Sequence, residues 1–474
     1  MAKNLIVVVF DTLRYDAVFG DLAQTPNLRR FAEQSAVFDN AWGEGLPTIP
    51  FRRALFTGMR SFPWRYHTDQ RGVFPHCHGW HAIPDDQTTV PEYLYANGYA
   101  TSLVSDVWHM FKPTMNFTRG FVTWDAVRGQ EGDTHRFGAP SLGAPEDLDP
   151  ARVGPASYLY QVKDRISDDD YFVSQVFDRA GRFVTDMGTS GPYCLWVESF
   201  SPHEFWDPPL RFADAYAPAH GGHEYIVPSR LNDTDPSGED IARTKALYQG
   251  YVTFCDERFG RFMETLEGSG ALENSVVAVL SDHGTELWDN GRFGKWGARP
   301  YRYNTQINLM IRHPDGAGAG QRIDSFVQNQ DIAPTLLSLL DIAHPRMDGE
   351  NLWPGVLGES DAVAAREYVV TGWGEFASVR DRSWNLVLNS LDPASDVRLF
   401  DVQAEGYEQT DVAGRHPDIV AQLTRRLENV LGGPLPAIYQ HQPGQGPEAT
   451  PGGLRQMREA ARQAGDSWAG SNLV

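Results

Sequence analysis

NLIVVVFD, from Asn4 to Asp11, is a short apolar run that ends in an acidic residue. The run is too short for a secretory signal, and no small-residue cleavage site follows it. A strand that is covered on both faces reads as a continuous apolar run instead of an alternating one. We therefore predict that Leu5 to Phe10 forms a buried strand of a parallel sheet, with Asp11 at its carboxyl end.

Similar apolar runs alternate with helical patterns along most of the chain. Further strands are predicted at Ala100–Val104, Tyr193–Ser199, Ser275–Leu280 and Ile307–Arg312. Helices are predicted from amphipathic patterns and from start and stop residues at Asn27–Glu33, Thr89–Asn97, Asp169–Met187, Ile241–Leu266 and Asp331–Leu340. Strands that alternate with helices form crossover units. The predicted fold class is α/β, with a mostly parallel central sheet flanked by helices.

The pattern changes after about residue 365. Short strands are predicted in the consecutive segments EYVVTGW, FASVRD, WNLVLNS and VRLFDV, and a helix follows at Pro417–Val430. Consecutive strands with one helix indicate a small antiparallel α+β subdomain. We predict a catalytic domain over 1–365, this subdomain over 366–432, and a Gly- and Pro-rich tail over 433–474. The tail is either a free arm or a contact in a homo-oligomer.

Charge and cysteine content restrict the partners and the compartment. The formal net charge of -21, from 41 basic and 62 acidic residues, argues against a nucleic-acid partner, which needs clustered Lys and Arg. Cys77, Cys194 and Cys255 show no paired spacing, which favours a reducing compartment over a disulfide framework. No run approaches the roughly 20 apolar residues of a membrane span. We predict a cytoplasmic protein with no membrane partner and a small anionic substrate, which a local positive site attracts.

Polar residues follow two of the predicted strands. Asp11 follows the first strand, and Asp282 and His283 follow the strand that contains VVAVLS. Ligands of open parallel sheets collect at the carboxyl ends of the strands. Two carboxylates and an imidazole at that edge are suitable ligands for one divalent cation. Taken singly, each of these residues could instead cap a helix or form a turn.

The segment LPTIPFRRALFTG, Leu46 to Gly58, adds a hydroxyl to this predicted site. Pro50 suits the first turn of a helix and Gly58 its end, so Thr48 should lie just ahead of the helix. Free N–H groups at that end attract anions, and Arg52 lies one turn further on. A metal that contacts Thr48 would activate its hydroxyl as a nucleophile. The alternative is that Thr48 only caps the helix.

The chain resembles the sulfatase and phosphonate monoester hydrolase branch of the alkaline phosphatase superfamily. The resemblance extends in the family's order from residue 4 to about residue 430. It rests on the segments NLIVVVFDTLRYD, TPNLRRFAEQSAVFDNAW, TIPFRRALFTG, TVPEYLYANGYAT, SPHEFWDPP, YQGYVTFCDERFGRFMETLE, VVAVLSDHG, DIAPTLLSLLDI and MDGENLWPG. Each segment alone is a weak signal, whereas the ordered set is specific. The resemblance implies the fold of this superfamily and an ester hydrolase of class EC 3.1.

The resemblance also implies roles for particular residues. Family members bind a metal through an aspartate after the first strand, here Asp11, and through two consecutive residues of a late motif, here Asp282 and His283. The nucleophile of the Cys/Ser-x-Pro-x-Arg signature falls on Thr48, and its arginine falls on Arg52. The resemblance thus makes Thr48 both the catalytic nucleophile and a ligand of the metal.

Two further positions are implied to contact the substrate. The histidine of the family's Pro-His motif, which lies near the leaving oxygen, falls on His203. A lysine that contacts the transferred group falls on Lys295, although its spacing to Tyr301 differs from the usual pattern. RGQEGD, Arg128 to Asp133, is interpreted from its glycines as a polar loop near the mouth of the site.

The chain departs from the family pattern at the predicted metal site and beside it. Thr12 replaces a second aspartate of calcium sulfatases, so with His283 as nitrogen ligand we predict one manganese or zinc ion rather than calcium. SDVWHMF replaces a Gly-Lys-Trp-His motif: it keeps a histidine, His109, and puts Asp106 where a lysine is expected. His109 is therefore either a ligand of substrate or metal or a structural histidine. Asp106, His109 and His203 together could bind a second metal.

The third departure is Thr48 itself, and it bears on the reaction. Family sulfatases convert Cys or Ser at this position into formylglycine, whose hydrate expels sulfate, and threonine cannot form that group. The sequence therefore predicts a metal-dependent hydrolase of phosphodiesters or phosphonate monoesters that acts through a covalent threonyl intermediate. One alternative is a sulfuric ester hydrolase that works without formylglycine. Another is a catalytically silent binder of sulfated or phosphorylated ligands.

Overall fold

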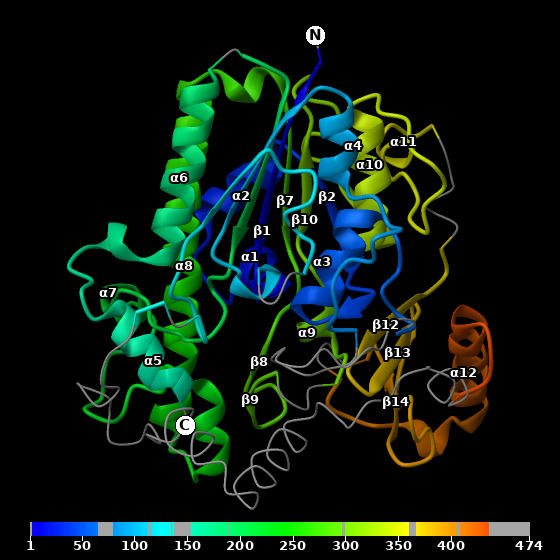
Figure 1. Ribbon diagram of the computed structural model, residues 1–474. Coiled ribbons are helices and arrows are strands. Elements are labelled where there is room, and N and C mark those ends of the chain that lie inside the picture. Colours follow the sequence, from blue (N-terminus) through cyan, green and yellow to red (C-terminus); the bar gives the residue numbers. More distant parts are fainter. Residues whose placement is uncertain are drawn as a thin grey trace, which may run out of the picture.

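An eight-stranded sheet runs through the centre of the molecule, with helices on both faces (Figure 1). The computed structural model describes residues 2–64, 79–111, 115–133, 135–136, 153–188, 190–295, 299–359, 366–404 and 408–435, except for the side chains of 153–157. In spatial order the strands are β11 (Arg322–Gln328), β2 (Ala36–Trp42), β10 (Leu309–Arg312), β7 (Ser275–Ser281), β1 (Asn4–Phe10), β6 (Tyr193–Ser199), β4 (Ala100–Ser105) and β5 (Thr123–Ala126). The predicted α/β class is confirmed.

The sheet is mostly parallel. β1 is parallel to β6 and β7, β4 is parallel to β5 and β6, and β11 is parallel to β2. The predicted strand at Ile307–Arg312 is β10, which begins at Leu309 and is antiparallel to β7 and β2. β2 and β11 were not predicted, because Asp39 and Asn40 interrupt the apolar run of β2 and β11 is an edge strand that is exposed over its first half.

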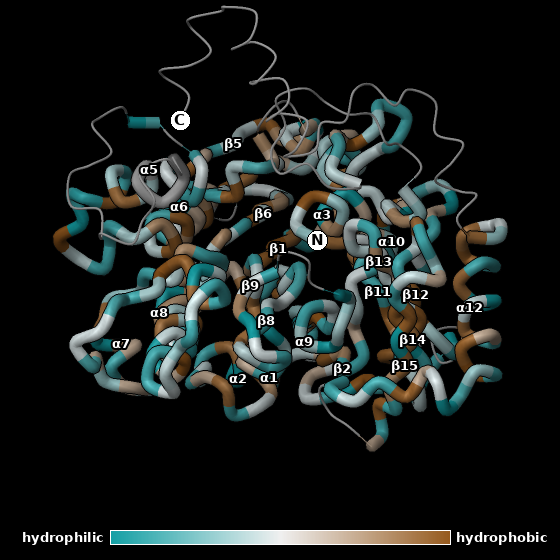
Figure 2. Tube along the Cα trace, turned by 90° about the horizontal axis from the view of Figure 1, so that it is seen from below, coloured by the Kyte–Doolittle hydropathy of each residue, from teal (hydrophilic) through white to brown (hydrophobic). Residues whose placement is uncertain are grey.

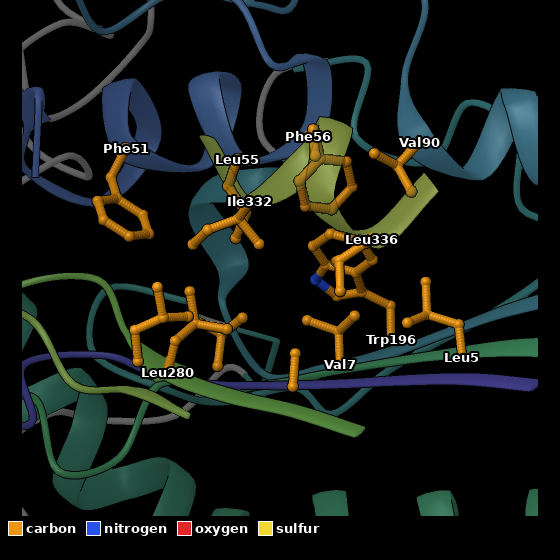
Figure 3. Packing of buried hydrophobic residues seen from close by; sticks show 14 of the residues in the cluster. Leu5, Val7, Phe51, Leu55, Phe56, Val90, Trp196, Leu280, Ile332 and Leu336 are labelled. Carbon is orange, nitrogen blue, oxygen red and sulfur yellow. The ribbon is translucent and has the colours of Figure 1, made fainter. Parts of the chain in front are cut away.

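Alternate residues of β1 point to opposite faces of the sheet, as strand geometry requires. Leu5, Val7 and Val9 belong to one buried cluster, and Ile6, Val8 and Phe10 belong to another. The first face is covered by α3 (Thr48–Thr57), α4 (Val90–Ala96), α10 (Ile332–Leu339) and α11 (Trp353–Val356); Figure 3 shows Phe51, Leu55, Ile332 and Leu336 above Val7. The second face is covered by α2 (Pro26–Glu33), α6 (Phe172–Met187) and α8 (Gly238–Gly268). The remaining helices of the central part are α1 (Tyr15–Phe19), α5 (Val153–Val162), α7 (Leu210–Asp214) and α9 (Arg302–Thr305).

The helix predicted at Asp169–Met187 is shorter than expected at its amino end. Asp168–Asp170 forms a 3-10 turn, and α6 begins at Phe172. Ser167 and Asp170 cap this turn reciprocally through side chain and backbone, which uses the first polar residues for a separate element.

Apolar residues gather in the interior, around β1 and α3 (Figure 2).

A second sheet contains β12 (Val369–Trp373), β13 (Phe376–Arg380), β14 (Trp384–Asn389) and β15 (Val397–Asp401), covered by α12 (Pro417–Leu431). These strands are antiparallel to one another, as predicted. β3 (Gly45–Leu46) joins this sheet parallel to β12, with Leu46 opposite Trp373. The sheet of the subdomain therefore includes residues that directly precede Thr48. A hairpin of β8 (Glu286–Leu287) and β9 (Phe293–Gly294) completes the strands of the described chain.

The tail from residue 436 onward, including its role in a homo-oligomer, lies outside the described residues. Across the described ranges, no helix combines the length and the apolar character that crossing a membrane requires. The cytoplasmic location and the absence of a nucleic-acid partner stay predictions.

Candidate active site

Three elements bring the predicted residues together at one edge of the central sheet. Phe10 of β1 lies opposite Ser281 of β7, so Asp11 and Asp282 follow at the same edge. α3 begins at Thr48, and Pro47 is its N-cap residue. The prediction that Thr48 lies ahead of this helix is wrong by one position, because the extended backbone of Pro47 occupies the cap. No side chain caps this helix, and Thr48 Oγ1 lies 3.5 Å from His283 Nε2.

Asp11, Asp282 and His283 form a compact group of buried ligand atoms. One ligand atom from each lies within 4.8 Å of the other two. His283 Nε2 is 3.6 Å from Asp11 Oδ1 and 3.5 Å from Asp282 Oδ2. His283 Nδ1 lies 2.9 Å from the Gly284 carbonyl oxygen, which can only accept, so Nδ1 carries the hydrogen and Nε2 presents a lone pair. Carbonyl contacts of this kind orient histidine ligands of metals.

The chemistry of this group fits a divalent cation. A lone pair of neutral His283 faces two carboxylates, and Asp11 Oδ2 is buried with no hydrogen bond to any described residue. Asp11, Asp282 and Glu198 surround the single guanidinium of Arg52, so the fully ionised set carries two uncompensated negative charges. A divalent cation would balance those charges and satisfy the lone pairs.

The pKa values of Asp11, Asp282 and His283 reflect their burial and their mutual charges. Burial and the charge of Asp282 raise the pKa of Asp11 well above its ordinary value. Burial opposes ionisation of Asp282 too, but His283 and Arg52 lower its pKa to about 2. Burial lowers the pKa of His283 to about 4, despite the attraction of Asp282. His283 is therefore neutral near pH 7, which is the form that binds metals.

Arg52 connects the metal ligands to the central sheet. Its Nη1 lies 2.6 Å from Asp282 Oδ2 and 3.2 Å from Asp11 Oδ2. Its Nε donates to Glu198 Oε2 at 2.8 Å, and Glu198 also accepts from Trp196 Nε1 at 2.9 Å. Arg52 Nη2 is buried and has no hydrogen-bond partner among the described residues. The guanidinium is thus fixed on two sides, with one nitrogen available to an anionic group.

Thr12 takes the place of a family aspartate but remains part of the site. Its hydroxyl donates to Asp11 Oδ1 at 2.9 Å, and its N–H donates to Asp282 Oδ1 at 2.9 Å. Its φ of 64° lies in the left-handed region, which a β-branched residue rarely adopts. Lys295 Nζ donates to Thr12 Oγ1 at 3.2 Å and pairs with Glu204. Lys295 therefore lies beside the predicted metal ligands, and its contact with the transferred group stays a prediction.

His203 contacts Glu204, the acid that pairs with Lys295. Its ring stacks on Phe200 with a centroid distance of 4.0 Å, and its Nδ1 lies 2.7 Å from the Glu204 carbonyl oxygen. That contact puts the hydrogen on Nδ1 in the neutral ring. Burial and the charge of Lys295 lower the pKa of His203. The same lysine lowers the pKa of Glu204 to about 2, although burial opposes this.

His109 is held by a carboxylate that the sequence analysis did not single out. His109 Nε2 lies 3.1 Å from Glu131 Oε2, which also accepts from Trp108 Nε1 at 3.0 Å. His109 Nδ1 is buried and has no hydrogen-bond partner among the described residues. Burial opposes ionisation of Glu131, but His109 lowers its pKa, and His203 contributes to this. Glu131 therefore contacts His109 directly, and its charge partly offsets the lowering of the pKa of His203.

Asp106 accepts hydrogen bonds from two neighbouring segments of the chain. Its Oδ1 accepts from the Phe200 N–H at 2.5 Å, and its Oδ2 accepts from Gln130 Nε2 at 3.0 Å. Burial raises its pKa to about 7. Among the described residues, Asp106, His109 and His203 do not form a group of closely spaced ligand atoms, so the second metal stays a prediction. Backbone and amide donors contact both Asp106 oxygens.

Known proteins resemble this chain in sequence and in fold. The sequence model described as "Sulfatase" matches residues 3–342, well over half of the chain. The chain belongs to the sulfatase family. It is 24% identical to choline-sulfatase of Rhizobium meliloti (strain 1021), over 89% of this chain and 84% of that protein. It is 25% identical to the multifunctional alkaline phosphatase superfamily protein PehA of Trinickia caryophylli, over 74% of this chain and 76% of that protein.

Solved structures share the fold of this chain. The phosphonate monoester hydrolase SpPMH from Silicibacter pomeroyi matches with a TM-score of 0.71 and 21% identity, over 90% of this chain and 95% of that chain. The predicted resemblance to the sulfatase and phosphonate monoester hydrolase branch of the alkaline phosphatase superfamily is confirmed. The protein is accordingly an ester hydrolase of the sulfatase family.

The predicted site residues differ in how closely they gather. Six of them contact one another in one network: Asp11, Thr48, Arg52, Asp282, His283 and, through Thr12, Lys295. His203 reaches Lys295 through Glu204, whereas His109 contacts Glu131. The sequence analysis missed Glu198, Glu204 and Glu131. A signal existed for Glu198, because it is a carboxylate inside the apolar run YCLWVES.

Proposed function

We propose that this sulfatase-family protein hydrolyses phosphodiesters or phosphonate monoesters through a covalent intermediate on Thr48. The observation that carries the proposal is the position of the Thr48 hydroxyl, 3.5 Å from His283 Nε2 and at the start of α3. The β-carbon of threonine carries a methyl group, so oxidation cannot convert it into the aldehyde of formylglycine. The side chain must therefore act as an alcohol.

Asp11, Asp282 and His283, with the Thr48 hydroxyl as a fourth ligand, would hold one divalent metal. A bound divalent cation supplies positive charge that lowers the pKa of a hydroxyl beside it and offsets charge on the transferred group. The single nitrogen ligand favours manganese or zinc over calcium. No further metal is needed for the steps that follow.

The first step transfers the phosphoryl or phosphonyl group to the protein. Thr48 gives up its hydroxyl proton to bulk water as its Oγ1 forms a bond to phosphorus, and the bond from phosphorus to the leaving oxygen breaks. Arg52 Nη2, which is buried and unpartnered among the described residues, donates to an oxygen of the transferred group, and Lys295 stabilises it electrostatically. His203 gives a proton to the leaving oxygen, which departs as an alcohol.

The second step regenerates threonine. Water attacks phosphorus, the bond to Thr48 Oγ1 breaks, and the threonine hydroxyl takes up a proton. The products are a phosphate monoester or a phosphonate. Sulfate esters are the second candidate, because the family model is that of sulfatases and Arg52 and Lys295 would attract a sulfate group equally. A silent binder of such anions is the third candidate.

Steady-state kinetics with matched substrates separate these candidates. Protein loaded with manganese or zinc should hydrolyse an aryl phosphodiester and an aryl phosphonate monoester with a higher kcat/KM than an aryl sulfate. Thr48→Ala should remove this activity, whereas Thr48→Ser should retain it in part. Acid quenching followed by peptide mass spectrometry should find the transferred group on Thr48. Equal rates for the wild-type protein and Thr48→Ala would contradict the proposal, and a preference for the sulfate would favour the second candidate.

A further inference from the structure

A cavity of about 330 Å³ lies where the C-terminal sheet meets the central sheet. Gln328 at the end of β11, Val370 of β12 and Val430 of α12 line it, together with Arg60 and Arg366. Its volume falls at the small end of the range of ligand pockets, about 300–1,000 Å³. The residues assigned to the Thr48 site do not line this cavity.

The charge of Arg366 in the cavity is already compensated. Both of its terminal nitrogens contact Asp331, with Nη2 at 3.0 Å from Oδ1 and Nη1 at 2.5 Å from Oδ2. Asp331 is fully buried, so this pair is a fixed part of the wall. Glu367 also lines the cavity, but its side chain is 78% exposed and lies 3.8 Å from Arg426. Neither acid therefore neutralises a second arginine.

Arg60 is that second arginine. Its Nη2 donates to the neutral amide oxygen of Gln328 at 3.3 Å. Its Nη1 is buried and has no hydrogen-bond partner among the described residues. The carboxylate of Glu44 interacts electrostatically with Arg60, but its oxygens accept hydrogen bonds from the N–H groups of Ser61 and Phe62, at 2.9 and 3.0 Å. A buried cationic donor without an acceptor is costly, and a carboxylate would satisfy it with a charge-assisted hydrogen bond.

We propose that this cavity is a second anion site, which binds a small organic carboxylate with an apolar body. Arg60 binds the carboxylate, and Gln328 holds the guanidinium in place. Tyr368, Val370 and Val430 provide the wall against which a flat apolar body packs. The proposal is independent of the reaction at Thr48, because it rests on different residues.

Isothermal titration of the metal-loaded full-length protein with benzoate tests this site. Benzoate should bind, and its neutral analogue benzamide should bind at least about tenfold more weakly, since one charge-assisted contact is worth roughly 1.5–3 kcal/mol. Arg60→Gln should weaken benzoate by a similar factor and leave benzamide unchanged. Val430→Phe, which fills the cavity without changing charge, should weaken both.

Two controls locate the binding. Arg382→Gln removes an exposed arginine that pairs with Asp324 away from the cavity, and it should leave benzoate affinity unchanged. Lys295→Ala should also leave it unchanged, whereas binding at the Thr48 site would be weakened. The proposal is overturned if benzoate does not bind, if benzamide binds equally well, or if Arg60→Gln retains full affinity. Loss of affinity in Lys295→Ala would instead assign the ligand to the Thr48 site.

Discussion

The two sides of the active site are built differently. The metal side consists of Asp11, Thr48, Arg52, Asp282 and His283, which come from the ends of β1 and β7 and from α3 and are at most 2% exposed. The histidine side consists of His109, Glu131, His203, Glu204 and Lys295, whose side chains are between 5% and 28% exposed and lie outside the strands of the central sheet. The metal side is fixed by the core of the fold, whereas the histidine side depends on loops that contact one another.

This difference assigns separate tasks to the two sides. On the metal side, buried charges lie close together. Burying them costs free energy, which the packing of the surrounding core must offset. The histidine side carries proton donors and charges whose pKa values depend on their mutual distances, as for His203 and Glu204. We expect changes on the metal side to affect all substrates, and changes on the histidine side to affect substrates according to their leaving group.

The largest effect is expected for Asp11→Asn. The substitution removes one of two anionic ligands while keeping the size of the side chain, so both metal affinity and turnover should fall. We expect kcat/KM for an aryl phosphodiester to fall on the order of 10³-fold, the upper end of the effect of losing one electrostatic group in an active site. Metal analysis after gel filtration should show substoichiometric metal. Asp21→Asn, at an exposed position, is the control and should retain both.

A smaller effect is expected for Arg52→Lys. Lysine keeps the charge but cannot contact Glu198, Asp282 and the substrate with one fork of donors. We expect a loss of about 10²-fold in kcat/KM. Glu198→Gln leaves Arg52 in place and removes only its orienting charge, so its loss should be about tenfold, typical of a supporting contact. If Arg52→Lys and Glu198→Gln lowered kcat/KM by the same factor, Arg52 would only hold its neighbours in place and would not act on the substrate.

Substitution of His203 should separate the two sides most clearly. His203→Gln should lower kcat/KM about 10²-fold for alkyl leaving groups, the usual size of a proton-transfer contribution, and have little effect on a p-nitrophenyl leaving group, which needs no proton. The protonated ring is the donor, and burial and Lys295 lower the pKa of His203. Activity on alkyl esters should therefore fall as pH rises through that lowered pKa, whereas activity on p-nitrophenyl esters should not. If His203→Gln lowered kcat/KM equally for both leaving groups, His203 would not be the proton donor to the leaving oxygen.

The same contrast explains what could be predicted from the sequence. Asp11, Asp282 and His283 follow apolar strands, and the sheet topology alone requires such residues to meet at one edge. Glu131 and Glu204 could not be placed in this way, because they lie in loops whose path depends on contacts distant in sequence, such as Trp108 with Glu131. Asp106 also follows a strand, but its oxygens are used by Phe200 and Gln130, which strand order does not reveal.

The fold shows a comparable limit. The buried strands β1, β6 and β7 have continuous apolar runs and were predicted within about one residue. β11 is an edge strand with alternating exposure, and β3 is only Gly45–Leu46, so neither has a local signal. The pairing of β3 with β12 depends on residues far apart in sequence. It could be established only from the structure, although it places Trp373 with its ring centroid 5.6 Å from that of His283.

The smallest effect is expected in the stability of the protein, at Asp106. Its pKa is about 7 in the folded protein because the carboxyl is buried, against an ordinary value of 3.8. Between these two values the unfolded chain gives up its proton first, so the contribution of Asp106 to stability falls as pH rises and is constant above about 7. Asp106→Asn keeps an acceptor for the Phe200 N–H and does not ionise. Its Tm should therefore decline less than that of the wild-type protein between pH 5 and pH 8, by on the order of a few degrees, as differential scanning calorimetry can measure. Parallel declines in the two proteins would show that Asp106 keeps its charge when folded, as a buried anion that accepts from Phe200 and Gln130.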